Sequence, residues 1–347
     1  MGSYLAGAMI VAALFAEPTS PFDTSHAKWK DCGTASGLLS IQACTLFIQS
    51  DDLIGVARAV AFYNRGTAYN ALHDYQNAIS DFDNAIHFRP VFFEAFTNRG
   101  IAFDSLGSVL GASVAFDNLG SLFGNSLHER AIQDFNQAIQ LKPDYYLAFV
   151  SRGYAYANLG QYKRAVEDYD EALRLLPDNT YALNDRGYSY YRLVQYQRAI
   201  QDYDRALQLN PYFNIAYQNR CSAKASLGVD LDGALADCMK SLEAHPNNLL
   251  SLQTRGFVYY LMGNYKASIA DEDGAISEFP ARAHYIRGLA KLKLGDEAEG
   301  NADITAAKSF NPKIVEAYAG EGLAITSFTA GVSQQLSPPK VQVQSPG

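Results

Sequence analysis

Apolar and small residues recur along most of the chain in short runs at helical spacing, and these runs come in pairs. Phe62, Gly66 and Tyr69 belong to the first run of one such pair, and Phe82 and Ala85 belong to the second. A spacing of three or four residues places these positions on one face of an α-helix. Each run is too short to form a stable helix by itself in water. The pattern therefore predicts pairs of helices that are stable only when they pack against neighbours.

The paired runs repeat with a regular period. A small residue, in most units preceded by an arginine, marks the first helix, and successive markers are separated by 34, 53, 34, 34, 35, 32 and 34 residues. The markers are Gly66, Gly100, Gly153, Gly187, Cys221, Gly256, Gly288 and Gly322. Recurring alanines mark the second helix, at Ala78, Ala131, Ala165, Ala199 and Ala234. The turn between the helices often carries glycine, as at Gly107, Gly160, Gly228, Gly263 and Gly295, and a proline closes each unit.

A period of 34 residues with these anchors resembles the tetratricopeptide repeat (TPR). The resemblance covers about residues 59–325 and implies an all-α fold. One helix pair cannot bury its own apolar face, so the pairs stack into an α-solenoid, a right-handed superhelix whose first helices line a concave groove. Seven units are predicted, at 59–92, 93–145, 146–179, 180–213, 214–248, 249–280 and 281–314.

The segments outside the repeats have other predicted roles. Residues 28–58 contain an amphipathic run that we expect to cap the first unit, and residues 315–325 begin like a further unit and are expected to form a capping helix. Residues 326–347 are rich in Ser, Gln and Pro without a period, which predicts a disordered tail.

The N-terminus indicates export. Residues 4–16 form an uninterrupted run of apolar and small residues, long enough for a signal-peptide core and too short to span a bilayer. We therefore expect a signal peptide in residues 1–27, cleaved after Ala16 or Ala27, and a periplasmic or otherwise exported mature chain without a membrane span. No lysine or arginine precedes Lys28, which leaves a partly buried N-terminal helix and a cytoplasmic location as the alternative.

The second unit carries 19 extra residues, at about 108–126. Within this excess, "AFDSLGS" at 102–108 returns as "AFDNLGS" at 115–121. An insertion at a turn between paired helices costs little stability. We expect it to lengthen the helices or add a loop, and a partner-binding protrusion is the alternative.

Two charged positions recur in fixed register. An arginine precedes the marker in seven units, at Arg65, Arg99, Arg152, Arg186, Arg220, Arg255 and Arg287. An aspartate recurs in the second helix, at Asp81, Asp134, Asp168, Asp202, Asp237, Asp271 and Asp303. Equal numbers in register favour Arg–Asp pairs between neighbouring helices over an anion-binding ladder of arginines, since the guanidinium fork fits a carboxylate.

The four cysteines are predicted to form two disulfides. Cys221 is the marker residue of a first helix, and Cys238 lies one turn beyond Ala234 in its partner helix. Antiparallel packing brings such positions within the distance that a bridge requires. Cys32 lies just before the predicted cap helix and Cys44 lies inside it, so a bridge between them can close a short loop. Two pairs of buried thiols are the alternative.

Catalytic signals are weak. The net charge of −8 and the lack of basic clusters argue against nucleic-acid binding. The six histidines are scattered, and no metal-ligand motif, phosphate loop or nucleophile motif is present, so we expect no catalytic residues, no metal and no cofactor. The paired carboxylates in "DFD", "DYD" and "DED" recur in unit after unit, which is more typical of solvated helix faces than of one active site.

A closer resemblance refines the class. The C-terminal half, including "NRCSAKASLGVDLDGALADCMKSLEAHP", is similar to a group of exported alphaproteobacterial TPR proteins, and "DCGTASGLLSIQACTLFIQS" resembles their N-terminal cap. The resemblance implies a non-enzymatic scaffold that binds a peptide or partner helix in its groove. The alternative is a structural or assembly protein of the cell envelope that acts by self-association.

Aromatic residues concentrate on the first helices from the third unit onward. Tyrosine offers a large contact area and a hydrogen-bonding tip, and it is enriched at binding hot spots. We expect a peptide or helix to contact Tyr154, Tyr181, Tyr188, Tyr191, Asn219, Phe257 and Tyr260. The lysines that hold acidic chaperone peptides in some TPR domains are missing, and only Asn98 matches that pattern, so we expect no binding of such peptides.

Overall fold

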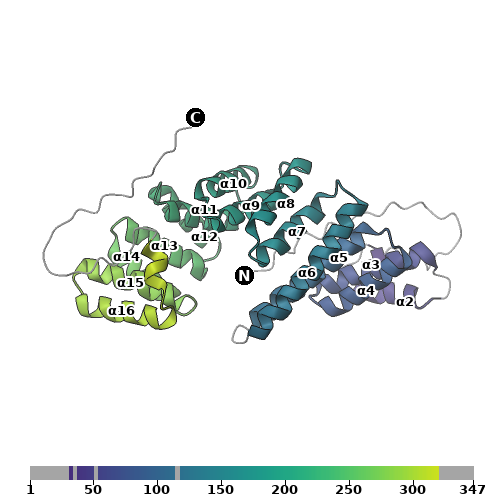
Figure 1. The fold of residues 1–347 in the computed structure, drawn as a ribbon, viewed down its shortest axis with the longest axis horizontal. Coiled ribbons are helices and arrows are strands. Elements are labelled where there is room, and N and C mark those ends of the chain that lie inside the picture. Colours follow the sequence, from purple (N-terminus) through teal and green to yellow (C-terminus); the bar gives the residue numbers. More distant parts are fainter. Residues whose placement is uncertain (1–30, 34–36, 51–53, 114–117, 320–347) are drawn as a thin grey trace. The chain divides into compact units, whose positions relative to one another are not determined.

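The computed structural model describes residues 31–33, 37–50, 54–113 and 118–319, and all regular secondary structure in these residues is helical (Figure 1). The all-α prediction is confirmed. The predicted signal peptide (1–27) and the predicted tail (326–347) lie outside the described residues.

The helices alternate as first and second members of pairs, which we call repeats 1 to 7 in chain order. The first helices are α3 (Gly55–Ala71), α5 (Phe93–Ser113), α7 (Tyr146–Asn158), α9 (Thr180–Arg192), α11 (Asn214–Leu227), α13 (Leu249–Leu261) and α15 (Pro280–Leu294). The second helices are α4 (Tyr75–Phe88), α6 (Asn118–Leu141), α8 (Tyr162–Leu175), α10 (Tyr196–Leu209), α12 (Leu231–Ala244), α14 (Tyr265–Ala275) and α16 (Glu297–Phe310). Helix α2 (Leu38–Ile48) precedes the first repeat, and α17 (Ile314–Ala319) follows the last.

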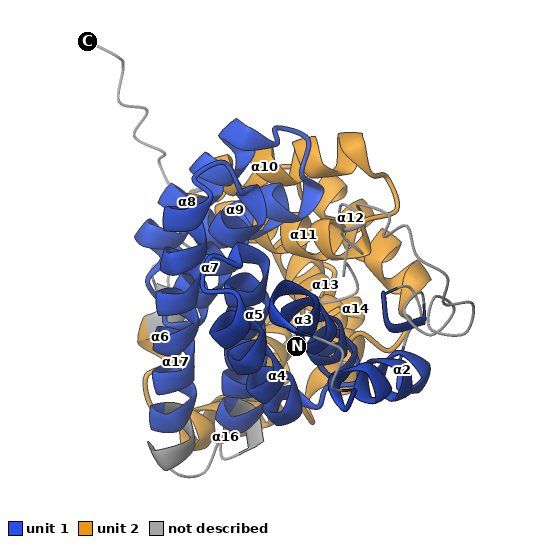
Figure 2. Ribbon diagram, turned by 90° about the vertical axis from the view of Figure 1, so that its right-hand side faces the viewer, with its two compact units in different colours: residues 1–193 blue, residues 194–347 orange. Residues whose placement is uncertain are grey.

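The chain divides into two compact units, residues 1–193 and 194–347, with the boundary between α9 and α10 (Figure 2). Within unit 1, α3 contacts α5, α5 contacts α7 and α7 contacts α9, whereas no two second helices of this unit make contact among the described residues. In unit 2, α11 contacts α13 and α13 contacts α15. In each unit the stack therefore curves toward its first helices, as in an α-solenoid.

The marker glycines allow close packing of the two helices in a repeat. A Cβ atom on Gly100 would lie 2.6 Å from Cε1 of Phe135, and one on Gly153 would lie 2.9 Å from Cε1 of Tyr169. Phe82 occupies the equivalent position against Gly66 in repeat 1. These aromatic rings are fully buried, so each of repeats 1 to 3 is centred on a ring packed against a bare helix backbone.

Later repeats fill the same position differently. In repeat 5 the marker is Cys221, which is bonded to Cys238, and in repeat 7 the marker Gly288 packs against Ile304. In repeat 6 the marker Gly256 meets Glu272, whose side chain is fully buried. The position that holds an aromatic ring in repeats 1 to 3 thus holds a carboxyl group here.

Both predicted disulfides are present. Cys32 is bonded to Cys44, with 4.7 Å between the Cα atoms, and Cys221 is bonded to Cys238, with 5.5 Å between the Cα atoms. The first bridge ties the segment before α2 to the middle of that helix. The second crosses from α11 to α12 inside repeat 5.

The extra residues of repeat 2 that the structure describes lie in longer helices. Helix α5 has 21 residues and α6 has 24, and residues 114–117 between them are outside the described residues. Gly107, expected in a turn, instead lies inside α5, where a Cβ atom would sit 2.9 Å from the carbonyl oxygen of Gly124 in α6. The sequence prediction of a turn at Gly107 is therefore wrong, because the insertion moves the turn past residue 113.

The glycines expected in the other turns adopt the conformation that requires them. Gly160, Gly228, Gly263 and Gly295 have φ between 70° and 90°. This left-handed region is strained for other residues, so glycine at these positions ends the first helix and reverses the chain.

Candidate interaction surface on the first helices

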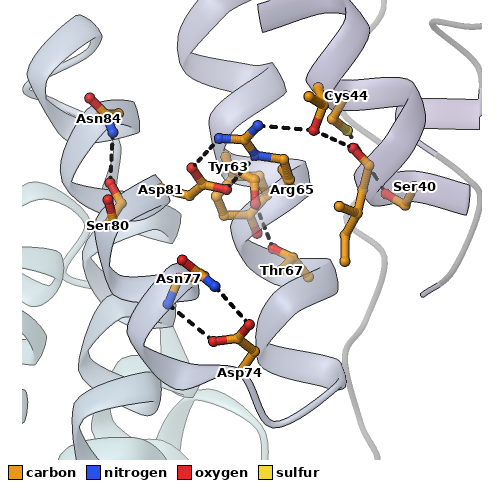
Figure 3. Close-up of polar contacts among 12 residues, drawn as sticks. Ser40, Cys44, Tyr63, Arg65, Thr67, Asp74, Asn77, Ser80, Asp81 and Asn84 are labelled. Carbon is orange, nitrogen blue, oxygen red and sulfur yellow. Dashed lines mark hydrogen bonds and ion pairs between the residues drawn. The ribbon is translucent and has the colours of Figure 1, made fainter. Parts of the chain in front are cut away.

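The recurring arginines are paired with the recurring aspartates. Arg65 donates from Nε and Nη2 to the carboxylate of Asp81 at 2.7 and 2.8 Å (Figure 3). The same two-bond pairing joins Arg99 to Asp134, Arg152 to Asp168, Arg220 to Asp237, Arg255 to Asp271 and Arg287 to Asp303. All six aspartates are at most 7% exposed. These guanidinium groups hold the paired helices together, and they do not form an anion-binding ladder.

Several of these arginines also bond to the preceding repeat through Nη1. The acceptors are Asp83 for Arg99, Asn136 for Arg152, Asp170 for Arg186, Asp204 for Arg220 and Asp273 for Arg287. The interpretation of the "DFD", "DYD" and "DED" pairs as solvated helix faces is wrong for their first carboxylate. Asp81, Asp168 and Asp271 are buried partners of an arginine in the same repeat. The second carboxylate of each pair is exposed and accepts a bond from an arginine of the next repeat.

In repeats 1 and 2, polar side chains of the first helices α3 and α5 are hydrogen-bonded to one another. Nδ2 of Asn98 on α5 donates to the hydroxyl of Tyr63 at 3.1 Å and to that of Thr67 at 3.3 Å, both on α3. Burial raises the pKa of Tyr63 to about 12, with Glu94 adding to the effect. Asn98 is thus used in bridging two first helices, which further weakens the resemblance to a clamp for acidic peptides.

The four tyrosines predicted as contacts in unit 1 lie on α7 and α9. Tyr154 is 38% exposed and Tyr181 is 55% exposed, while Tyr188 and Tyr191 are half-buried. The ring of Tyr188 packs edge-on against Tyr162 of α8, with 6.4 Å between centroids. Tyr154 and Tyr181 therefore offer the larger accessible ring areas, and Tyr188 is partly used in packing.

Carboxyl groups lie among these tyrosines. Asp104 on α5 is 5% exposed and accepts bonds from Nδ1 of His128 at 2.7 Å and Nδ2 of Asn158 at 3.2 Å. Asp185 on α9 accepts a bond from Nδ2 of Asn184 at 3.0 Å. Burial raises the pKa of Asp185 to about 6, opposed by that one bond. Burial, followed by the charges of Asp104 and Asp185, raises the pKa of Tyr154 to about 12.

The predicted contacts in unit 2 are less accessible. Phe257 is 2% exposed and lies in the core with Tyr285 and Ile286, and the guanidinium of Arg282 lies 5.3 Å from its ring centre. The expectation that Phe257 faces a groove is therefore wrong, because residues of α15 cover it. Tyr260 is half-buried against Tyr265, with 5.8 Å between ring centres, and Asn219 is half-buried.

Two features of unit 1 have no counterpart in the sequence predictions. The Asp104–His128 pair joins α5 to α6 and extends through Asn158 to α7, so one histidine considered scattered is part of a buried network. The insertion shifts the register of α6, and for this reason the repeat pattern does not place His128 beside Asp104. An open hollow of about 540 Å³ is lined by His73, Asp74, Tyr75, Gln76, Leu106 and Val109.

Within the described ranges, no group of three or more His, Cys, Asp or Glu side chains is arranged to hold a metal ion. No helix among those described is both long and apolar enough to cross a membrane. The candidate interaction surface is formed by tyrosines, amides and carboxyl groups.

The fold defines the class as an α-solenoid repeat protein. Among solved structures, the chain is similar to a tetratricopeptide repeat protein from Parabacteroides merdae, with 19% identity over 76% of this chain and 98% of that one and a TM-score of 0.53. It is also similar to PilW, a type IV pilus biogenesis factor, with 18% identity, 63% and 98% coverage and a TM-score of 0.50. YrrB, described as a TPR protein with an unusual peptide-binding site, matches with 21% identity, 62% and 97% coverage and a TM-score of 0.45.

The sequence comparison agrees with the structural one. The tetratricopeptide repeat family model matches residues 120–180 and 150–212. No curated protein matches the chain. The same pairing of helices recurs within each unit, so the fold is that of tetratricopeptide repeats, and the family model matches part of the chain. At this level of identity the similar structures establish the fold only.

Proposed function

We propose that this protein is a non-enzymatic scaffold that binds a peptide or partner helix along the first-helix face of unit 1. Solenoids of this kind present extended curved surfaces to partners. The observation that supports the proposal is the exposure of Tyr154 and Tyr181 on adjacent first helices, whose other aromatic residues are half-buried or buried. Exposed aromatic rings beside amides and carboxyl groups are typical of binding hot spots.

The residues proposed to contact the partner are chosen by the exposure of their side chains. Tyr154, Tyr181, Tyr188 and Tyr191 form the proposed contact set in unit 1. Asn219 and Tyr260 of unit 2 stay separate predictions of partner contacts and are not part of this set. Phe257 is removed from the predicted contacts because its ring is buried. We expect the tyrosines to contribute more than the amides, since their rings bury more apolar area on binding.

Export is proposed on a separate ground. The two disulfides are stable in an oxidising compartment and rare in the reducing cytosol. We therefore propose that the protein works in the periplasm or another exported location. Fractionation of the native cells, with thiol labelling of the denatured and unreduced protein, tests this: reactive thiols in the native material would contradict it.

Partner capture with matched variants tests the proposed surface. The double variant Tyr154→Ala/Tyr181→Ala should lose partner capture from native extract while its circular-dichroism spectrum stays helical. The control is Tyr212→Ala, because Tyr212 is 88% exposed in the connection between α10 and α11 and lies outside the proposed surface. Undiminished capture by the double variant would reject the surface. Concentration-dependent self-association in light scattering, without any captured partner, would favour the envelope-assembly alternative.

A further inference from the structure

The first-helix face of unit 1 carries carboxyl groups without a matching set of cations. Asp104 is bonded to His128 and Asn158, and Asp185 accepts a bond from the neutral amide of Asn184. The arginines of the same helices are committed elsewhere: Arg99 and Arg152 pair with Asp134 and Asp168. Arg186 of α9, next in sequence to Asp185, donates to Asp170. Among the described residues Asp185 therefore has no ion-pair partner on a partly buried face, which is an unfavourable position for a charge.

A second polar group below this face also lacks a partner. The hydroxyl of Tyr169 is fully buried and has no hydrogen-bond partner in the described structure. Its ring packs against Gly153 of α7, with a Cβ atom there falling 3.1 Å from Cζ. Tyr154, next to Gly153, and Asp185 both act electrostatically on this hydroxyl, so the three groups lie near one another. A buried hydroxyl, which can accept a hydrogen bond, and an uncompensated carboxyl group together indicate a place where a polar ligand group would be stabilised.

The tyrosines next to this place already bind one guanidinium from the chain. The guanidinium carbon of Arg192 lies 4.6 Å from the ring centre of Tyr162 and 5.8 Å from that of Tyr188. Nη1 of Arg192 also donates to the hydroxyl of Tyr188 at 2.9 Å. Arg192 lies about one helical turn after Tyr188, and Asp185 lies about one turn before it. The exposed ring of Tyr154 and the carboxyl group of Asp185 offer a second cation a related combination, an aromatic ring and a hydrogen-bond acceptor.

We propose that this surface, formed by Tyr154, Asp185 and Tyr188, binds a cationic side chain of a partner peptide, with arginine preferred over lysine. The inference rests on the proposed function and specifies its partner as basic. The guanidinium would donate to Asp185 and stack on a tyrosine ring, a geometry that suits arginine because its fork is planar. The net charge of −8 would also favour the approach of a basic partner.

A randomised peptide library displayed on phage tests both proposals with the full chain as bait. We expect selected peptides to be enriched in arginine, then lysine, and this enrichment to be lost with Asp185→Asn. The control is Glu171→Gln, which removes one exposed carboxylate from α8 and changes the net charge by the same amount. One selected peptide is then titrated beside its Arg→Gln analogue.

The outcomes are distinct. The arginine-to-glutamine change should weaken binding to the wild-type chain by about tenfold or more, and should have little further effect with Asp185→Asn. Enrichment of neutral or acidic peptides would overturn the cationic preference and leave the proposed function standing. No enrichment of any peptide would overturn both. If Asp185→Asn does not fold, Tyr154→Leu replaces it, and retained arginine preference in that variant would also count against the proposal.

Discussion

Nη1 of Arg99 in repeat 2 donates to Oδ1 of Asp83 in repeat 1 at 2.5 Å. The same guanidinium makes two bonds to Asp134 of its own repeat, at 2.6 and 2.8 Å. The side chain of Asp134 is 8% exposed and that of Asp83 is 57% exposed. One arginine thus connects two carboxylates whose burial differs widely, and the energetic consequences of losing each should differ as well.

The first prediction concerns this arginine. Arg99→Ala should lower the free energy of unfolding by about 3–5 kcal/mol, because it leaves Asp134 buried without its partner. Asp83→Asn removes only an exposed ion pair and should cost less than about 1 kcal/mol. Urea denaturation followed by circular dichroism measures both changes. Equal losses in the two variants would contradict the assigned difference in burial.

The second prediction concerns the marker glycines. Gly100→Ala should cost about 1–3 kcal/mol, since the new methyl group would lie 2.6 Å from Cε1 of the buried Phe135. Gly111→Ala is the matched control in the same helix, where a Cβ atom meets nothing within 4 Å. It should stabilise the chain by about 0.5–1 kcal/mol through helix propensity alone. Thermal unfolding of the two variants should therefore shift in opposite directions.

The third prediction concerns the disulfide of repeat 5. Cys221 and Cys238 occupy the positions held by Gly153 and Tyr169 in repeat 3. Cys221→Ala/Cys238→Ala should cost about 3 kcal/mol, the size expected for a closed loop of this length. Cys221→Gly/Cys238→Tyr should recover part of that loss by restoring the packing of repeat 3. Denaturation under non-reducing conditions compares the three proteins; a Gly–Tyr variant no more stable than the Ala–Ala variant would contradict the equivalence.

The repeats and the disulfides could be predicted because their anchors recur. A period of 34 residues fixes which positions of paired helices meet, and Cys221 and Cys238 fall on two such positions. The pairing of arginine with aspartate follows from the same register. The bond from Arg99 to Asp83 could not be predicted from this register. Asp83 belongs to the neighbouring repeat, so the contact depends on how the repeats stack.

The candidate surface was predicted only in part. Tyr154 and Phe257 both directly follow a marker glycine, yet Tyr154 is 38% exposed and Phe257 is 2% exposed. The difference arises from the next first helix, because Arg282 of α15 lies over the ring of Phe257. A residue's position in its own repeat determines the side of the helix, but the neighbouring helix determines whether that side stays open.

Repeat 6 holds a carboxyl group at the position where repeats 1 to 3 hold an aromatic ring. Glu272 is fully buried against Gly256, and neither of its carboxyl oxygens has a hydrogen-bond partner in the described structure. Ser268, one turn earlier on α14, also has a buried hydroxyl without a partner among the described residues. Burial, opposed by the charge of Arg282, raises the pKa of Glu272 well above its usual range. The neutral acid is therefore the form that the folded repeat favours.

This raised pKa makes stability depend on pH. Above a pH of about 4.5, the unfolded chain loses the proton of Glu272 while the folded chain keeps it. The free energy of unfolding should therefore fall as pH rises from about 5 toward the folded pKa, and become independent of this group above it. Glu272→Gln cannot ionise and should flatten that part of the curve. Glu278→Gln, at an exposed position near the end of repeat 6, is the matched control.

Replacing Glu272 with an aromatic residue should also stabilise repeat 6. Glu272→Phe supplies the ring that Phe82 and Phe135 supply in repeats 1 and 2, and it removes two unsatisfied buried oxygens. We expect the free energy of unfolding to rise by about 1–3 kcal/mol at neutral pH, where the buried acid is least favourable. Denaturation curves of the wild type, Glu272→Gln and Glu272→Phe between about pH 5 and pH 8 measure slope and offset together. A wild-type slope identical to that of Glu272→Gln would show that the carboxyl group reaches solvent or a counter-ion, and the buried position would then be wrong.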